Sequence, residues 1–161
     1  MNIERLKNQL RIDEGVANKI YFINDLPHLG VGHLITKDDP EYNLLPLLTK
    51  GSVSEVKITN KIVDEYFDKD VKIAIDSCKK VFDNWQSLPD EAQQIIANMM
   101  FNMGINRFRG FKKFIAAIEK KDYKLAANEM EDSLWFKDKK RGVGKRAVRL
   151  RDRMLIVDHY I

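Results

Sequence analysis

The side chains in the first thirty residues that can transfer protons include Glu14, Asp25 and His28. Glu14 falls at the end of a predicted helix, where the negative end of the helix dipole disfavours a carboxylate, so this acid needs a partner. A carboxyl group that is partly removed from water keeps its proton near neutral pH. An imidazole can accept a proton or attack carbon directly. These residue types are the ones that acid–base chemistry requires.

The spacing of apolar residues predicts the elements that hold these groups. Ile3, Leu6 and Leu10 follow helical spacing, which predicts a helix over residues 3–13 that ends near Gly15. The segment from residue 19 to 59 is rich in Gly, Pro, Asn and β-branched residues, which predicts a small hairpin sheet with loops.

Helical patterns fill the rest of the chain. Thr59 is a predicted N-cap for a helix whose apolar face comprises Val63, Tyr66, Phe67, Val71 and Ala74. A second helix is expected from residue 88 to Gly104, with a core stripe of Ala92, Ile95, Ile96, Met99, Met100 and Met103. A third stripe comprises Phe108, Phe111, Phe114, Ile115 and Ile118, and two or three further helices are expected after it.

This order of elements predicts an α+β fold in a single domain over residues 1–161. A small antiparallel β-hairpin sheet lobe (residues 15–59) and a mostly α-helical lobe (residues 1–14 and 81–161) are expected to be joined by a long inter-lobe helix (residues 60–80). Two lobes joined in this way leave a cleft, which is a usual place for a ligand.

Charge and composition narrow the possible partners. The net charge is +4, and nine basic residues against two acids lie between residues 137 and 153: Lys137, Lys139, Lys140, Arg141, Lys145, Arg146, Arg149, Arg151 and Arg153. Such a stretch is either a solvated helix face or a surface for a polyanion. The single cysteine, Cys78, cannot form an internal disulfide and is expected to be a buried, inert thiol.

Several short motifs, taken in order, resemble the T4-type phage lysozymes. The signature of this family is a glutamate-glycine pair, a hairpin and a glycine-x-glycine-histidine strand, which correspond here to residues 10–15, 19–21 and 29–34. The likeness continues at residues 58–59, 67–71, 98–104, 110–111, 133–135 and 145–147, so that it covers nearly the whole chain.

The resemblance implies hydrolysis of the β-1,4 bond between N-acetylmuramic acid and N-acetylglucosamine in bacterial peptidoglycan. This chemistry needs one carboxylic acid to protonate the leaving oxygen and a second group to deliver or stabilise the nucleophile. Glu14 matches the family's acid, and Arg146 matches the arginine that pairs with it and orients it. No cofactor and no metal are implied.

Further roles follow from the same resemblance. His33 aligns with a histidine that pairs with an aspartate on the inter-lobe helix, here Asp70, and this pair is expected to be structural. Leu34, Phe101 and Asn102 fall where the family binds substrate, although Phe101 also fits a packing role. Trp85 and Trp135 are expected to pack in the interior rather than bind sugar.

The hairpin departs from the family pattern. The family has an aspartate two residues after the tyrosine and a threonine two residues before the first glycine, whereas this chain has Ile23 and His28 there. The loop is also one residue shorter, and Asp25 is the nearest carboxylate. Three alternatives are open: Asp25 takes the place of the family aspartate, His28 is the polar group opposite Glu14, or the site has lost its activity. The first two are compatible, with Asp25 polarising His28.

The leading hypothesis is a peptidoglycan-cleaving muramidase that acts as a phage endolysin or a tail-associated enzyme. The first thirty residues lack the apolar stretch of a signal peptide, so we expect synthesis in the host cytoplasm and holin-dependent release to the cell wall. A monomer without stable membrane insertion is expected. A non-catalytic wall-binding module is a second class. A nucleic-acid-binding protein is a third, which the shortage of aromatic residues in the basic stretch disfavours.

Overall fold

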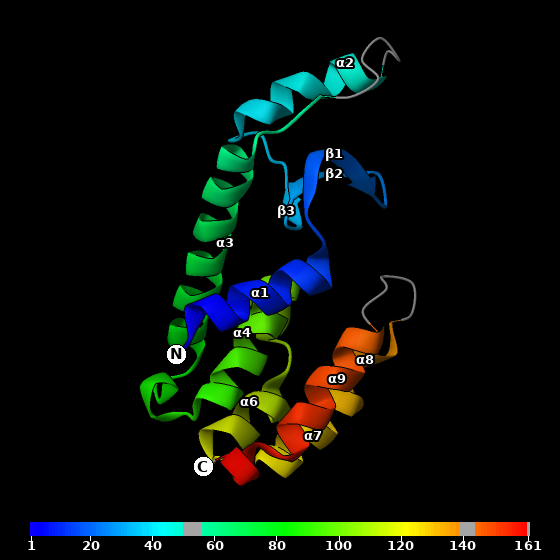
Figure 1. Cartoon of the computed structure of the whole chain (residues 1–161). Coiled ribbons are helices and arrows are strands. Elements are labelled where there is room, and N and C mark those ends of the chain that lie inside the picture. The colour runs from blue at the N-terminus through cyan, green and yellow to red at the C-terminus, as the bar shows by residue number, and fades with distance from the viewer. Residues whose placement is uncertain (50–55, 139–143, 161) are drawn as a thin grey trace. The chain divides into compact units, whose positions relative to one another are not determined.

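The computed structural model describes residues 1–49, 56–138 and 144–160, and its fold is α+β, as the sequence predicts. The chain divides into two compact units, of which unit 1 comprises Met1–Leu6 and Ile73–Ile161 and unit 2 comprises Lys7–Lys72. The division falls inside helices α1 (Ile3–Glu14) and α3 (Asn60–Val81), so each of these helices contributes residues to both units (Figure 1).

A three-stranded antiparallel sheet is the centre of unit 2. Its strands are β1 (Ala17–Ile23), β2 (Leu26–Gly30) and β3 (His33–Leu34), and they lie in that order beside α3 (Figure 1). A Cβ atom added to Gly30 would lie 3.2 Å from the Val63 side chain, so β2 packs directly on α3. The buried apolar residues of this unit include Leu29, Val31, Ile35, Ile58, Val63, Phe67 and Val71.

The end of α1 is held against α3 within unit 2. Leu10 is fully buried, and the Arg11 guanidinium lies 5.0 Å from the centre of the Phe67 ring. Lys7 Nζ lies 2.5 Å from the Asp68 carboxylate. These contacts fix the last turn of α1, and therefore the place where Glu14 leaves the helix.

Two short helices lie where the sequence predicted only strands and loops. A 3₁₀ helix, η1 (Pro40–Leu44), runs directly into α2 (Leu45–Thr49). Pro40 and Pro46 both occupy first-turn positions, where the missing N–H of proline costs nothing. The leucine-rich run 44–48 has no polar face, which explains why its apolar spacing did not indicate a helix.

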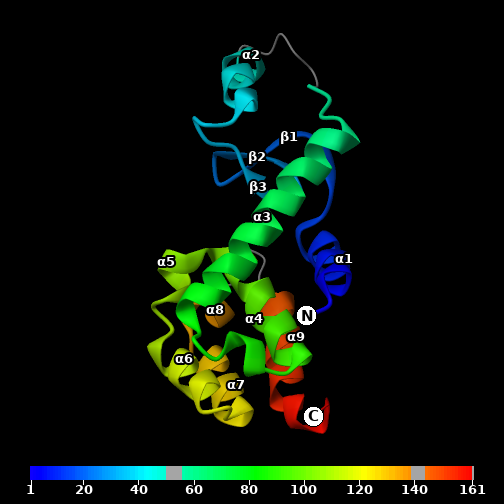
Figure 2. The same ribbon diagram turned by 90° about the vertical axis from the view of Figure 1, so that its left-hand side faces the viewer.

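Unit 1 is helical. Its helices after α3 are α4 (Asp90–Met103), α5 (Ile105–Phe108), α6 (Lys112–Glu119), α7 (Tyr123–Glu131), α8 (Leu134–Lys137) and α9 (Gly144–Leu155), with short 3₁₀ turns η2 (Trp85–Ser87) and η3 (Val157–Tyr160). Helix α9 packs on α4, α7 and α8 (Figure 2). Trp85 and Trp135 are both buried in this unit, as expected.

Helix α4 is buried on every side from Ala92 to Met100. Its apolar stripe is in the core as predicted, but Gln93, Gln94 and Asn98 are buried as well. The polar members keep their hydrogen bonds: Gln93 donates to the Trp85 carbonyl at 2.7 Å, and Gln94 donates to the Asn2 carbonyl at 2.7 Å. The amphipathic pattern therefore underestimated the burial of this helix, because its polar residues are satisfied internally.

The third apolar stripe does not form one helix. Phe108 ends α5, Phe114 lies in α6, and Gly110 and Phe111 lie between the two helices. The two buried rings still meet edge to face, with centroids 5.9 Å apart. The spacing correctly identified Phe108, Phe114 and Ile118 as core residues, whereas Phe111 and Ile115 are only partly buried. Gly110 interrupts the helix between Phe108 and Phe114.

Much of the basic stretch is engaged inside unit 1. Arg153 bonds Glu91 at 2.6 Å, Arg151 bonds Glu131 at 2.8 Å, and the buried Arg146 bonds Asn98 at 2.8 Å. Lys139, Lys140 and Arg141 lie outside the described residues. The described part of this stretch therefore offers less uncompensated charge to a polyanion than the sequence suggested.

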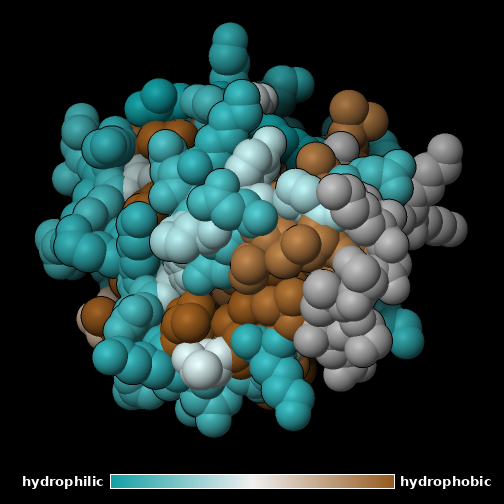
Figure 3. Space-filling model, turned by 90° about the horizontal axis from the view of Figure 1, so that it is seen from above, coloured by the Kyte–Doolittle hydropathy of each residue, from teal (hydrophilic) through white to brown (hydrophobic). Residues whose placement is uncertain are grey.

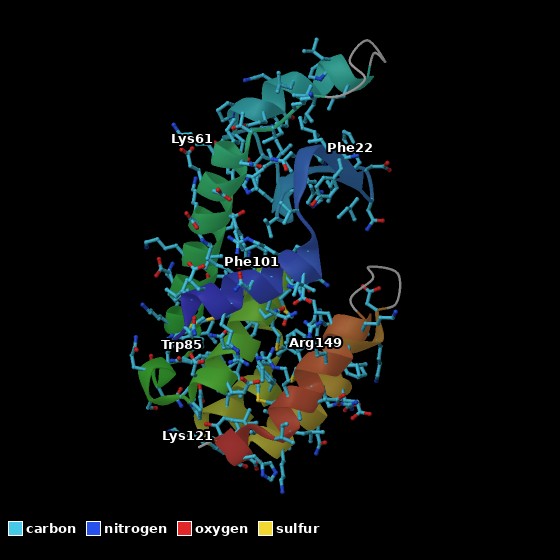
Figure 4. All side chains as sticks on the ribbon, in the orientation of Figure 1. Phe22, Lys61, Trp85, Phe101, Lys121 and Arg149 are labelled. Carbon is cyan, nitrogen blue, oxygen red and sulfur yellow. The ribbon has the colours of Figure 1, made fainter. Side chains whose placement is uncertain are left out.

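In the described part of the chain, every helix is too short or too polar to span a lipid bilayer. Unit 2 nevertheless exposes several large apolar side chains, namely Phe22, Ile23 and Leu26 on the hairpin and Leu47 on α2. Apolar surface gathers on the face seen from above (Figure 3), and Phe22 can be found on the hairpin in Figure 4.

Candidate active site

Glu14 is the last residue of α1 and lies over a glycine turn. Gly15 leaves the helix with φ +75° and donates its N–H to the Arg11 carbonyl at 2.9 Å, as helix-terminating glycines do. The half-buried Glu14 side chain then rests against Gly32, where an added Cβ would lie 2.7 Å from Glu14 Oε2. Gly32 has φ +63°, so both its conformation and its neighbour require glycine. The glycine-x-glycine turn thus makes room for the carboxyl of Glu14.

Tyr21 and His28 form a cross-strand pair beside Glu14. The two residues are directly opposite each other in β1 and β2, and their rings stack with centroids 5.6 Å apart and planes 24° apart. Burial and the charge of Glu14 raise the pKa of Tyr21, while a hydrogen bond from the Gly32 backbone acts in the opposite direction. Within unit 2, Tyr21 therefore stacks on His28 and interacts with Glu14 and the Gly32 backbone.

The imidazole of His28 has a defined orientation. Its Nδ1 lies 2.8 Å from the Leu26 carbonyl oxygen, and because a carbonyl only accepts, Nδ1 must carry the proton. In the neutral ring, Nε2 then has the free lone pair. Leu34 lies opposite His28 on β3 and is 42% exposed. Tyr21, His28 and Leu34 consequently form a row across the three strands.

Asp25 lies at the tip of the hairpin. Asn24 and Asp25 form a two-residue loop between the paired Ile23 and Leu26, and both loop residues have positive φ, 50° and 64°. This is the geometry of a type I′ turn, which Asn and Asp tolerate. Asp25 is exposed, and its carboxyl makes no hydrogen bond or ion pair with a described residue. The structure does not bring Asp25 into contact with Glu14 or His28.

His33 lies between two carboxylates. Its Nδ1 is 2.7 Å from Asp70 Oδ2, and its Nε2 is 2.9 Å from Asp39 Oδ2. Desolvation opposes the charged ring, but the hydrogen bonds to Asp70 and Asp39 outweigh it and raise the pKa of His33. The ring also stacks on Tyr66, with centroids 4.1 Å apart, and the Tyr66 hydroxyl donates to Glu41. This cluster ties β3 to α3 and to the start of η1.

Asp39 was missed by sequence analysis, although it is buried and contacts His33 directly. It also accepts a hydrogen bond from the Thr36 N–H at 3.0 Å, and these two bonds lower its pKa against the opposing effect of burial. The only sequence signal was an aspartate directly before Pro40, which is a turn pattern rather than a sign of an ion pair.

We predict that the stability of unit 2 decreases as the pH rises, because His33 loses its proton. A raised folded pKa means that the stabilisation is complete below the unfolded value of about 6.5 and is lost as pH rises through the folded value. The free energy of unfolding, measured in urea from pH 5.5 to 9, should fall with pH in the parent protein and fall much less in His33→Gln. The exposed His159 provides the matched control, His159→Gln, whose profile should follow the parent. Equal slopes for the parent and His33→Gln would contradict this assignment.

The remaining predicted site residues lie in unit 1. Phe101 and Asn102 are partly buried near the end of α4, and Figure 4 labels Phe101. Asn102 Oδ1 accepts a hydrogen bond from Trp135 Nε1 at 2.8 Å, which fixes its amide. Arg146 is 7% exposed and is oriented by its bond to Asn98. Its pairing with Glu14 and the substrate contacts of Phe101 and Asn102 remain predictions.

Comparison with known proteins indicates the class to which this chain belongs. A model of the family described as "Phage lysozyme" matches residues 12–153. The probable T4-type lysozyme 2 of Dictyostelium discoideum is 29% identical over 145 residues, which cover 83% of this chain and 85% of that protein. The probable T4-type lysozyme 1 of the same organism is 30% identical over the same length and coverage.

Taken with the α+β fold, these matches define a glycoside hydrolase of the lysozyme type, a muramidase-like enzyme of peptidoglycan. Within that class, the chain belongs to the phage lysozyme family. The family match includes Glu14 and the whole hairpin.

Proposed function

We propose that this protein hydrolyses the β-1,4 bond between N-acetylmuramic acid and N-acetylglucosamine, with Glu14 as the general acid and His28 as the second catalytic group. The observation that carries the proposal is the Tyr21–His28 pair next to Glu14, with Asp25 outside it in the turn. Glu14 protonates the glycosidic oxygen as the bond from that oxygen to the anomeric carbon breaks.

Two routes are open to the His28 imidazole. Nε2 can take a proton from a water molecule that attacks the anomeric carbon, which inverts its configuration. Alternatively, Nε2 attacks that carbon itself, and water or another sugar hydroxyl then displaces the imidazole, which retains the configuration and permits transglycosylation. The configuration of the first product, followed by NMR during digestion of soluble peptidoglycan fragments, separates the routes.

Asp25 and His28 are the two candidates for the second catalytic group, and mutation of each distinguishes between them. We expect His28→Ala to lower kcat by about 10²–10⁴-fold, the usual contribution of a general base. We expect Asp25→Asn to stay within about twofold of the parent, because Asn keeps the positive φ of the turn and Asp25 has no described partner. The measurement is the rate of release of reducing ends from purified peptidoglycan. A severe Asp25→Asn and a mild His28→Ala would assign the role to Asp25 instead.

A second candidate function is a wall-binding protein without activity, motivated by Ile23 at the position where the resemblance expects an aspartate. Such a protein would sediment with insoluble peptidoglycan and release no reducing ends. Release of reducing ends by the purified parent protein therefore excludes it.

We further propose that the biological role is lysis of a phage host, with the enzyme held in the cytoplasm until a holin opens the inner membrane. Membership of the phage lysozyme family supports this role. The test is expression in a bacterium. Cells should remain intact until the inner membrane is permeabilised and should then lyse, and Glu14→Gln should prevent lysis.

A further inference from the structure

Tyr21 interacts with three other residues of the site. It is half-buried on β1, its ring stacks on His28, and its phenol lies close to Glu14 and to the backbone of Gly32. The sequence motif contains this tyrosine but indicates no task for it. Its neighbours on both sides are the two groups to which the proposed function assigns the chemistry.

We propose that Tyr21 is a positioning residue, whose ring holds the His28 imidazole in the plane that directs Nε2 toward the substrate. This inference rests on the proposed function for its catalytic meaning, but the effect of Tyr21 on His28 can be measured without any substrate.

Two contacts define how the imidazole is held. The bond from Nδ1 to the Leu26 carbonyl, 2.8 Å long, fixes one edge of the ring and its tautomer. A single hydrogen bond of this kind can open, and the ring is then free to rotate about its Cβ–Cγ bond. The face of Tyr21, 24° from the imidazole plane, removes that freedom. Because the Tyr21–His28 pair is directly opposite across β1 and β2, the backbone itself sets the separation of the rings.

The hydroxyl of Tyr21 has a separate environment. Burial together with the charge of Glu14 raises the pKa of Tyr21, so the phenol stays neutral near neutral pH. The ring therefore contacts His28, whereas the hydroxyl is affected by the charge of Glu14 and by the Gly32 backbone. Replacing Tyr21 by Phe removes the hydroxyl only, whereas replacing it by Leu also removes the aromatic face.

The control residue is the next one along the strand. Phe22 pairs with Pro27, and because side chains alternate along a strand, it points to the opposite face of the sheet from Tyr21. It is 50% exposed. Phe22→Leu therefore makes the same kind of change, an aromatic ring to leucine on the same strand, away from His28.

The experiment combines kinetics with ¹⁵N NMR of the His28 imidazole in the full-length protein. In the parent, the ¹⁵N shifts of the neutral ring should report one tautomer with the proton on Nδ1. Tyr21→Leu should give averaged shifts and a kcat lower by roughly 10- to 100-fold with KM nearly unchanged, as expected when a reacting group is misplaced. Tyr21→Phe should recover the parent spectrum and most of kcat, and Phe22→Leu should match the parent in both. If Tyr21→Leu does not fold, Tyr21→Met can replace it. Methionine also lacks a ring, so the same averaged shifts and the same loss of kcat are expected.

Each outcome decides a different point. An unchanged His28 spectrum in the ringless variant overturns the inference, whatever happens to kcat. A changed spectrum with an unchanged kcat leaves Tyr21 as the residue that orients His28 and counts against His28 as a catalytic group. In that case His28→Ala should also retain activity, so failure of the proposed function is separated from failure of this inference.

Discussion

Glu14→Gln should reduce the release of reducing ends from peptidoglycan by at least about 10²–10⁴-fold, which is the contribution of a general acid. Glutamine has nearly the same shape, so it should keep the contact with Gly32 but has no acidic proton to donate. Folding should not suffer. A carboxylate at the C-terminal end of a helix is electrostatically unfavourable, so replacing its charge should not unfold the protein, and a melting curve of Glu14→Gln checks that the variant is folded.

Glu4→Gln is the matched control for this variant. Glu4 lies in the first turn of the same helix, is exposed, and undergoes the same chemical change. Its activity should equal that of the parent, while its stability should fall slightly because an acid in the first turn is favourable. Parent-like activity in Glu14→Gln would refute the general-acid assignment and with it the proposed mechanism.

Gly32→Ala should also have a large effect, because it moves Glu14 without changing it. The new Cβ would lie 2.7 Å from Oε2, 3.1 Å from Cδ and 3.3 Å from Cβ of Glu14, so the whole side chain must shift. We expect kcat to fall by roughly 100-fold, as for a displacement of about 1 Å in a reacting group. A non-glycine residue at positive φ also costs roughly 1–2 kcal/mol of stability, measurable by urea unfolding.

Gly15→Ala separates these two effects. Gly15 also has positive φ, at +75°, but an added Cβ there meets no atom within 4 Å. It should therefore lose a similar amount of stability and much less activity than Gly32→Ala. Equal losses of activity in the two variants would show that backbone strain, rather than displacement of Glu14, limits catalysis.

The periodicity of apolar residues alone predicted much of the helical structure. The stripe of α4 and the stop at Gly104 follow from the sequence, and so does the N-cap of α3, where Thr59 accepts a hydrogen bond from the Ile62 N–H. The helices η1 and α2 could not be found in this way, because a run of leucines without polar residues has no face to detect. The split between α5 and α6 was missed because one glycine within an apolar pattern is usually tolerated.

The candidate site, like the fold, could be predicted from the sequence only in part. The motif around Glu14 indicated the proposed acid, but the positions of Asp25 and His28 relative to it depend on strand register, which apolar spacing does not determine. A one-residue shift in register exchanges the two faces of a strand. The dipeptide Asn24-Asp25 is suited to a tight two-residue loop, and that signal could have placed His28 opposite Tyr21. Asp39 is brought to His33 only by the fold, and sequence spacing offers no equivalent signal.

The two-residue turn at Asn24 and Asp25 also limits how this enzyme can be re-engineered. A loop of that length has no spare residue, so an insertion must be absorbed by a bulge or by moving one strand along the other. Either change would alter the partner of Tyr21 and the direction of His28. New specificity in this hairpin is therefore better sought by exchanging side chains at constant length, and Ile23 and Leu26, both about half exposed, are the positions at which the backbone need not change.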